Sequence, residues 1–369
     1  MSFGSCSLRV FGCTRRATAV CDAEIGDGAE GIVDRDDRRP RRWCSGARLR
    51  RVAPSAGARG QARLPHPMHG GAAPTRGSER RVVSQVGARG HDRAASKGGY
   101  NVEAMRTFRA ATLNIWSRFG PWEERGGAIR EGLRTLAPDV IGLQEVLRFP
   151  GFDQAELVSR GLGYAIAWGR ASENHGYPVG NAILSRWPIL RTEVIALPNG
   201  GSDEDRSLVY AELDAPFGKL PFFCTHLNWK FHHGHIRCLQ VKAIAEAVAR
   251  LAPVEGFPPV VVGDFNAEPD SDEIRFMRGL TGLGGNCVYF ADAFHVAGDG
   301  SPGTTFSKKN QFAEPMREPE RRIDYVFVRG PDDSQRGEPT EARVCFDQPF
   351  EGIFPSDHFG VIATITAGR

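Results

Sequence analysis

The fold of this 369-residue sequence is decided by the stretch Val260-Val-Val-Gly-Asp264-Phe-Asn266-Ala-Glu-Pro269. Its apolar, β-branched start predicts a buried strand over 260–262. Because strand side chains alternate between faces, Asp264 and Asn266 should leave the strand end on the same side. A carboxylate beside a carboxamide can orient a water while the amide donates to a phosphate oxygen. An Asx-rich turn after a strand is the alternative for this stretch taken alone.

Two further stretches place acidic residues at strand margins. Pro355-Ser-Asp357-His358-Phe-Gly360 precedes the last predicted strand; here the imidazole can contact a phosphate while the carboxylate turns to a metal, and a capped turn is the alternative. In Arg322-Ile-Asp324-Tyr-Val-Phe327 a lone carboxylate interrupts an apolar strand. Such a carboxylate commonly hydrogen-bonds an imidazole and fixes its charge and orientation. A buried salt bridge, for example to Arg322, is the competing interpretation.

Three more predicted strands end in polar residues, at Asn114, at Gln144-Glu145 and at Thr225-His226. Glu145 follows a mostly apolar run, so a carboxylate there is costly or protonated unless a cation accompanies it. One shared cleft explains all six interruptions together.

From Phe108 onward, short β-rich runs alternate with amphipathic helices, the helices being predicted over 123–136, 153–161 and 234–251. Roughly eleven strands are too many for one open sheet. We therefore expect an α/β (α+β) domain in which two sheets pack face to face with helices outside, covering residues 105–369. The strands are predicted at 109–115, 140–146, 164–168, 181–185, 192–197, 207–214, 220–226, 260–262, 323–328, 342–346 and 360–366.

Residues 1–104 form an Arg-rich, low-complexity N-terminal extension that lacks helical or strand periodicity and is predicted to be disordered. One alternative is an arm that binds nucleic acid or an anionic membrane. Another is a targeting peptide, although the acidic residues Asp34, Asp36 and Asp37 argue against a targeting peptide. The interpretation we favour is that the extension is translated upstream sequence and that the true start lies near Met105.

The charge of the chain divides in the same place. Residues 1–100 hold 19 Lys and Arg against 9 Asp and Glu, a net charge of +10. Residues 101–369 hold the remaining 28 basic and 35 acidic residues, a net charge of −7. The net charge of +3 for the whole chain therefore describes neither part. An acidic domain disfavours a nonspecific or processive DNA nuclease. The eight cysteines contain no C-x-x-C pair, which favours free thiols. The absence of a long apolar run or secretory signal predicts a cytoplasmic protein, expected to be a monomer.

The ordered polar motifs resemble the endonuclease/exonuclease/phosphatase superfamily, which includes pancreatic-type deoxyribonucleases, abasic-site endonucleases, inositol polyphosphate 5-phosphatases, neutral sphingomyelinases and mRNA deadenylases. The resemblance covers about residues 105–369. It implies a four-layer sandwich whose strand ends form one pocket, and a Mg²⁺ or Mn²⁺ ion. The matching motifs are Leu113-Asn114, Gln144-Glu145, Thr225-His226-Leu227, Gly263-Asp264-Phe265-Asn266, Ile323-Asp324-Tyr325 and Ser356-Asp357-His358.

The same resemblance implies roles for these residues. The metal ligands would be Asn114, Glu145 and Asp357, an oxygen set that suits a hard divalent cation. Without that cation, four carboxylates would repel a phosphodiester by several kcal/mol at an effective dielectric constant of about 20. The catalytic residues would be His226 as a phosphate or leaving-group contact, Asp264 for the attacking water or the leaving oxygen, Asn266 for the scissile phosphate, and Asp324 paired with a phosphate-contacting His358.

The substrate is less defined by the sequence. Asn181, Arg206 and Trp229 are the candidate substrate-binding residues, and the aromatic and basic stretch 228–235 suits stacking on a base or sugar, with a solvated loop as the alternative. The phosphoester could belong to a nucleic acid, a lipid head group or a small phosphodiester or phosphomonoester. A catalytically inactive binding scaffold is the non-enzymatic alternative.

Overall fold

The computed structural model describes residues 106–368, so the predictions for residues 1–104 lie outside the described part of the chain. One sheet of the described domain has the strand order β12-β13-β1-β2-β5-β4, with β3 paired to β2. Its strands are β1 (Arg106–Asn114), β2 (Val140–Phe149), β3 (Phe152–Asp153), β4 (Ala165–Asn174), β5 (Tyr177–Ser185), β12 (Pro339–Cys345) and β13 (Gly360–Gly368).

The second sheet has the order β10-β11-β9-β8-β7-β6. Its strands are β6 (Ile189–Leu197), β7 (Arg206–Ala215), β8 (Gly218–His226), β9 (Val260–Asp264), β10 (Ala291–Asp292) and β11 (Asp324–Val328). The helices are α1 (Trp122–Leu136), α2 (Gln154–Ser159), α3 (Gly234–Leu251), α4 (Asp272–Met277) and α5 (Ala293–Ala297), with short 3₁₀ turns at Phe231–His233 and Glu314–Met316.

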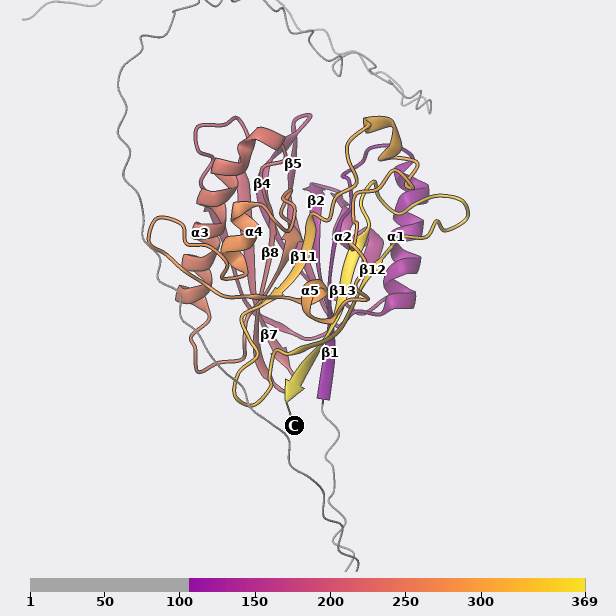
Figure 1. The fold of residues 1–369 in the computed structure, drawn as a ribbon. Coiled ribbons are helices and arrows are strands. Elements are labelled where there is room, and N and C mark those ends of the chain that lie inside the picture. The colour runs from indigo at the N-terminus through magenta and orange to yellow at the C-terminus, as the bar shows by residue number, and fades with distance from the viewer. Residues whose placement is uncertain (1–105, 369) are drawn as a thin grey trace, which may run out of the picture. The chain divides into compact units, whose positions relative to one another are not determined.

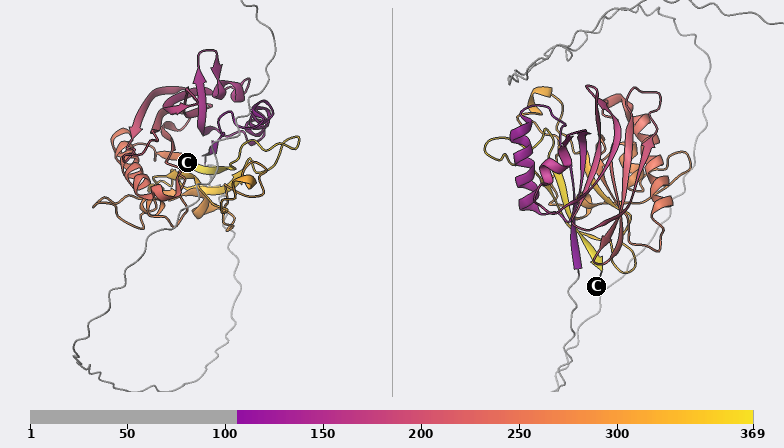
Figure 2. Two further views of the ribbon diagram at one scale, coloured as in Figure 1. Left: turned by 90° about the horizontal axis from the view of Figure 1, so that it is seen from above. Right: turned by 180° about the vertical axis from the view of Figure 1, so that it is seen from behind.

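Three apolar layers hold the domain together. Phe222, Val260 and Val361 lie in the layer between the two sheets, whereas the apolar stripe of α3 packs on the outer face of the second sheet. Helices α1 and α2 cover the outer face of the first sheet. The helices therefore lie on opposite outer faces, as Figures 1 and 2 show. This arrangement confirms the predicted four-layer sandwich.

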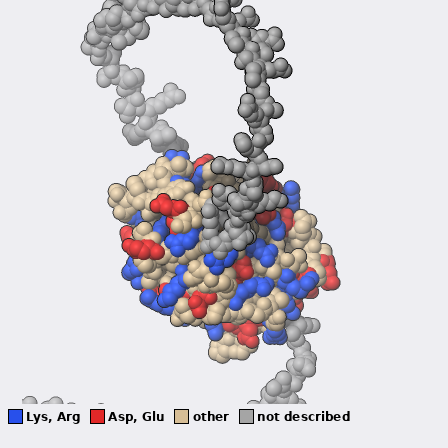
Figure 3. Space-filling model, turned by 90° about the horizontal axis from the view of Figure 1, so that it is seen from below, with Lys and Arg blue, Asp and Glu red and all other residues tan. Residues whose placement is uncertain are grey.

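The strand directions bring the functional motifs to one end of the sandwich. Strands β1 and β2 pair in parallel, as do β8 and β9, while the other pairs are antiparallel. In the second sheet, Asp264 at the end of β9 lies between His226 at the end of β8 and Asp324 at the start of β11. The upper end of the domain in Figure 1, where β13 begins, therefore gathers these residues. Figure 3 shows the opposite end, where Lys, Arg, Asp and Glu are interspersed over the visible surface.

The largest difference from the predicted elements is at β4 and β5. The predicted strand 164–168 continues to Asn174 and pairs with an equally extended β5 as a two-stranded ribbon. Much of this ribbon is partly exposed, so it lacks the apolar alternation on which the prediction relied. The two-residue strands β3 and β10 and the short helices α4 and α5 were also missed, because segments of this length carry too little periodicity. Among the helices of residues 106–368, none is long and apolar enough to cross a membrane.

Gly263 permits the close parallel pairing that brings Asp264 and His226 together. A Cβ atom added at this residue would lie 2.1 Å from the carbonyl oxygen of Thr225 on β8. We expect Gly263→Ala to lower the free energy of unfolding by about 3 kcal/mol, because β8 and β9 would have to separate. Urea denaturation of the full chain measures this. Gly127→Ala is the matched control: its Cβ meets open space in α1 and should leave stability unchanged or raise it by up to about 1 kcal/mol. Equal effects of the two substitutions would contradict this account of Gly263.

Candidate active site

A β-bulge aims Glu145 into the cleft. The pairing of β2 with β5 shifts register between Leu143 and Val146, so Gln144 and Glu145 together form the bulge. Gln144 is fully buried and bonded to Thr112, whereas Glu145 has a φ of 59° and accepts a hydrogen bond from Asn114 Nδ2 at 3.1 Å. A positive φ at a non-glycine residue is uncommon and is maintained here by the surrounding sheet.

Asp264 is the centre of the cluster. Its Oδ2 atom accepts a hydrogen bond from Asn114 Nδ2 at 3.0 Å and lies 3.4 Å from His226 Nε2 and 3.8 Å from His358 Nε2. Its Oδ1 atom accepts from the backbone N–H of Asn266 at 2.9 Å. The Asn266 side chain in turn lies 3.0 Å from His226 Nε2. Burial, and then the nearby Asp324 carboxylate, raise the pKa of Asp264.

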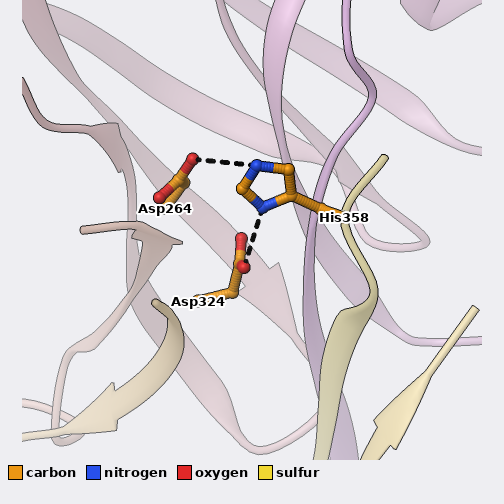
Figure 4. Close-up of side chains that lie close together, drawn as sticks. All are labelled: Asp264, Asp324 and His358. Carbon is orange, nitrogen blue, oxygen red and sulfur yellow. Dashed lines mark hydrogen bonds and ion pairs between the residues drawn. The ribbon is translucent and has the colours of Figure 1, made fainter. Parts of the chain in front are cut away.

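His358 lies between two carboxylates, as Figure 4 shows. Its Nδ1 is 3.0 Å from Asp324 Oδ2, and its Nε2 faces Asp264. Burial alone would lower the pKa of His358, but the two carboxylates outweigh it and raise the pKa to about 10. The alternative partner for Asp324 is occupied elsewhere, because Arg322 forms a two-bond ion pair with Asp292. The predicted pairing of Asp324 with His358 is thus present in the geometry.

Asp264, Asp324 and His358 could also be taken for a metal centre, because they offer ligand atoms within 4.8 Å of one another. An imidazolium, however, has no lone pair to give a metal. With the pKa of His358 near 10, the three residues form a carboxylate–imidazolium–carboxylate arrangement at neutral pH. A cation would have to displace that proton to bind there.

Two further carboxylates, those of Asp357 and Glu145, offer oxygen atoms to a cation. Asp357 is 4% exposed. Burial raises its pKa to about 7, and Glu145 adds to the rise against the opposing effects of His358 and Arg125. A buried carboxylate that is half protonated near neutral pH, beside a second carboxylate, is relieved by a divalent cation. Glu145, Asp357 and the adjoining Asn114 therefore fit a hard metal ion.

Arg125 is a buried residue that the sequence analysis missed. Its side chain in α1 is fully buried, and its guanidinium donates to five backbone carbonyl groups. They belong to Ile115, Trp116, Ser117, Phe119 and Pro355. Burial lowers the pKa of Arg125 to about 10, so it remains charged at neutral pH. It thereby ties the segment after Asn114 to the segment before Asp357. The available signal was its position three residues after Trp122 and four before Ile129, on the apolar stripe of the helix.

A pocket of about 300 Å³ adjoins the cluster. Glu145 and His226 line it together with Asn181, Arg206 and Trp229. Asn181 is buried and donates through Nδ2 to the Ser207 carbonyl. Trp229 is 51% exposed at the rim. The three residues expected to bind substrate therefore share one pocket beside the cluster.

These features define a class of protein: a four-layer sandwich with carboxylate, imidazole and amide side chains converging at one end of its two sheets. The chain belongs to the Endonuclease/Exonuclease/phosphatase family, whose model matches residues 111–358. Members of this family are typically metal-dependent phosphoesterases.

The chain is also similar to proteins of known sequence or structure. YbhP, an uncharacterized protein of Escherichia coli K12, is 28% identical over 243 residues, which cover 60% of this chain and 85% of YbhP. An endonuclease/exonuclease/phosphatase from Beutenbergia cavernae is 25% identical with a TM-score of 0.56, over 71% of this chain and 72% of that one. The fold is also shared with D. rerio TDP2 solved with a single-strand DNA product, at 21% identity and a TM-score of 0.58, over 70% of this chain and 99% of that one.

Arg125→Met should lower the free energy of unfolding by about 3–5 kcal/mol, because it leaves buried carbonyl groups without donors. Denaturation of the full chain followed by tryptophan fluorescence measures this loss. Arg130→Met, an exposed arginine of the same helix, is the matched control and should change stability by less than about 0.5 kcal/mol. A similarly small effect at Arg125 would show that its hydrogen bonds contribute little.

Proposed function

We propose that residues 105–369 form the catalytic domain of a divalent-metal-dependent hydrolase that cleaves a phosphodiester or phosphomonoester bond by in-line attack of water. The observation that carries the proposal is the convergence of Asn114, His226 and His358 on one oxygen of Asp264, at 3.0, 3.4 and 3.8 Å. This oxygen faces hydrogen-bond donors on three sides, an arrangement suited to orienting a water beside a phosphate group.

The roles follow from charge. His358, held as an imidazolium by Asp324, can donate to a non-bridging phosphate oxygen and stabilise its growing negative charge. Asn266, whose backbone N–H donates to Asp264, would add a neutral amide donor to the phosphate. Asp264, with its raised pKa, can take the proton of the attacking water or return one to the leaving oxygen. Asn114 holds that carboxylate in place.

A divalent ion, Mg²⁺ or Mn²⁺, bound by Glu145, Asp357 and Asn114 would supply Lewis-acid stabilisation of the phosphate oxygens. The Asp357 carboxylate is suited to it because, among the described residues, the cations that act on it are His358 and Arg125. The N–H groups of the Arg125 guanidinium all donate to backbone carbonyl groups. Arg125 therefore cannot bridge the two carboxylates itself.

The pocket favours a small or short substrate. It is lined by the further carboxylates Glu173, Asp203, Glu204 and Asp205. Three of these are paired with cations, Glu173 with Arg170, Asp203 with Lys230, and Glu204 with Arg206 and Lys230, yet no broad basic groove is formed by the lining residues. A polyanion would be repelled there, so we favour a single phosphoester or the end of a short single strand. The single-strand DNA product bound by D. rerio TDP2 makes the nucleic-acid end a specific candidate.

Asp264→Asn should reduce kcat/KM by about 10²–10⁴ with little loss of stability, because the amide cannot accept the proton. The full chain would be assayed with Mg²⁺ and Mn²⁺ against single-stranded and abasic DNA, RNA, sphingomyelin, inositol phosphates and a bis-aryl phosphodiester. Asp214→Asn, an exposed aspartate on β7, should retain wild-type activity. No turnover of any substrate, or full activity of Asp264→Asn, would favour the inactive scaffold or another mechanism.

Glu145→Gln should weaken Mg²⁺ binding at least tenfold, since a neutral amide replaces a charged ligand. Titration calorimetry of the full chain measures the affinity without any substrate. Glu156→Gln, at an exposed residue of α2, provides the control. Unchanged Mg²⁺ affinity in Glu145→Gln would exclude Glu145 as a ligand.

A further inference from the structure

His226 lies between a cation and an anion. Its Nδ1 is 3.0 Å from Arg206 Nη1, and its Nε2 is 3.4 Å from Asp264 Oδ2. The imidazole is 6% exposed, so these two neighbours act on it with little screening by solvent. Arg206 is on the pocket side of the ring and Asp264 is on the cluster side.

These neighbours select one form of the neutral ring. A guanidinium has only donors, so the atom facing Arg206, Nδ1, must be the acceptor. The proton then resides on Nε2 and points toward the Asp264 carboxylate. The opposite tautomer would direct an N–H at a cation and a lone pair at a carboxylate, which is unfavourable at both atoms. The Asn266 Nδ2 is a competing donor 3.0 Å from Nε2, but it is neutral and donates to the Leu227 carbonyl at 3.1 Å, so the charged neighbours Arg206 and Asp264 outweigh it.

The doubly protonated form is also disfavoured. Burial holds the pKa of His226 well below its usual range, and the positive charges of Arg206 and His358 lower it further. The two histidines of the cluster therefore differ in charge: His358 is an imidazolium between carboxylates, and His226 is a neutral ring facing an arginine.

Glu204 holds Arg206 in this position. Its Oε2 accepts from Arg206 Nη2 at 3.2 Å and from the backbone N–H of Trp229 at 3.3 Å. The side chains of Glu204 and Arg206 are only 12% and 13% exposed. Glu204, which precedes β7 in the sequence, thus connects the Trp229 backbone at the rim of the pocket to the His226 ring through the guanidinium of Arg206.

We propose that Glu204 and Arg206 are positioning residues that lock His226 in its neutral Nε2–H tautomer, so that the Nε2–H, which faces Asp264 in the free protein, donates to the phosphate group when a substrate binds beside that carboxylate. The part of this proposal that concerns the substrate rests on the proposed function, whereas the tautomer is a property of the protein alone. His226 then acts as a fixed donor and not as a general base. Since Glu204 also binds the Trp229 backbone, the arrangement connects the pocket occupied by the rest of the substrate to the reacting phosphate.

Histidine-selective ¹⁵N NMR of the full chain tests the tautomer directly, because protonated and unprotonated ring nitrogens have well-separated shifts. The His226 signals are assigned by their loss in His226→Gln. In the wild type near pH 7 we expect an unprotonated Nδ1 and a protonated Nε2. In Arg206→Met the Nδ1–H form should become populated, while Arg206→Lys, which keeps a cationic donor, should retain the wild-type signals. Glu204→Gln should give a partial change.

Matched controls come from the exposed ion pair of Arg191 and Glu193 on β6. Arg191→Met and Glu193→Gln should leave the His226 signals unchanged. A protonated Nδ1 in the wild type, or an unchanged tautomer in Arg206→Met, would overturn the proposal whatever the activity of the protein. With a hydrolysed substrate, Arg206→Met should lower kcat about tenfold or more and Arg206→Lys should recover most of it. Equal kcat in the wild type, Arg206→Met and Arg206→Lys would exclude a catalytic role for the positioning of His226 by Arg206. The hydrolase assignment would be unaffected.

Discussion

The charge balance of buried carboxylates is the constraint on which the site depends. The parallel pairing of β8 with β9 and the antiparallel pairing of β9 with β11 bring Asp264 and Asp324 side by side, both almost wholly buried. Two like charges at this distance would oppose folding unless a cation lay between them. His358, two residues before β13 of the other sheet, supplies that cation. The ion pair therefore joins the two sheets, because Asp264 and Asp324 belong to one sheet and His358 precedes a strand of the other.

The same need for balance explains the other side of the cluster. Asp357 and Glu145 lie near Arg125. The N–H groups of Arg125 bind backbone carbonyl groups, but its positive charge still acts on the two carboxylates. That charge lowers the repulsion between the two carboxylates without filling their lone pairs. The two carboxylates therefore keep oxygen atoms that could bind a divalent cation. Placing these side chains in the site requires an unfavourable backbone conformation. Glu145 and Asn266 both have a positive φ, which the neighbouring strands must maintain.

Residues at strand ends were predictable from the sequence because a polar residue that interrupts an apolar run is a local signal. The motif at 260–269 gave both β9 and the pair Asp264 and Asn266, and the long apolar stripe gave α3 with the bounds that the structure has. Arg125 and Glu204 were not predicted, since the partners of Arg125 are backbone carbonyl groups, and Glu204 acts on Trp229 and, through Arg206, on His226, which only folding brings near. The bulge at Glu145 was missed for a related reason: it depends on the register between β2 and β5, which a single strand does not encode.

The two cluster histidines show how one cleft can give the same side chain opposite properties. His358 faces Asp324 and Asp264 and becomes a cation, which adds a charged donor on the side where a phosphate would gain negative charge. His226 faces Arg206 and stays neutral, so its single proton has a fixed place on Nε2. Because both rings lie within 4 Å of Asp264 Oδ2, a second charged imidazole there would compete with the first for that carboxylate and lower the basicity of Asp264. A neutral donor at His226 leaves Asp264 able to accept a proton, which is the property that water attack on a phosphoester requires.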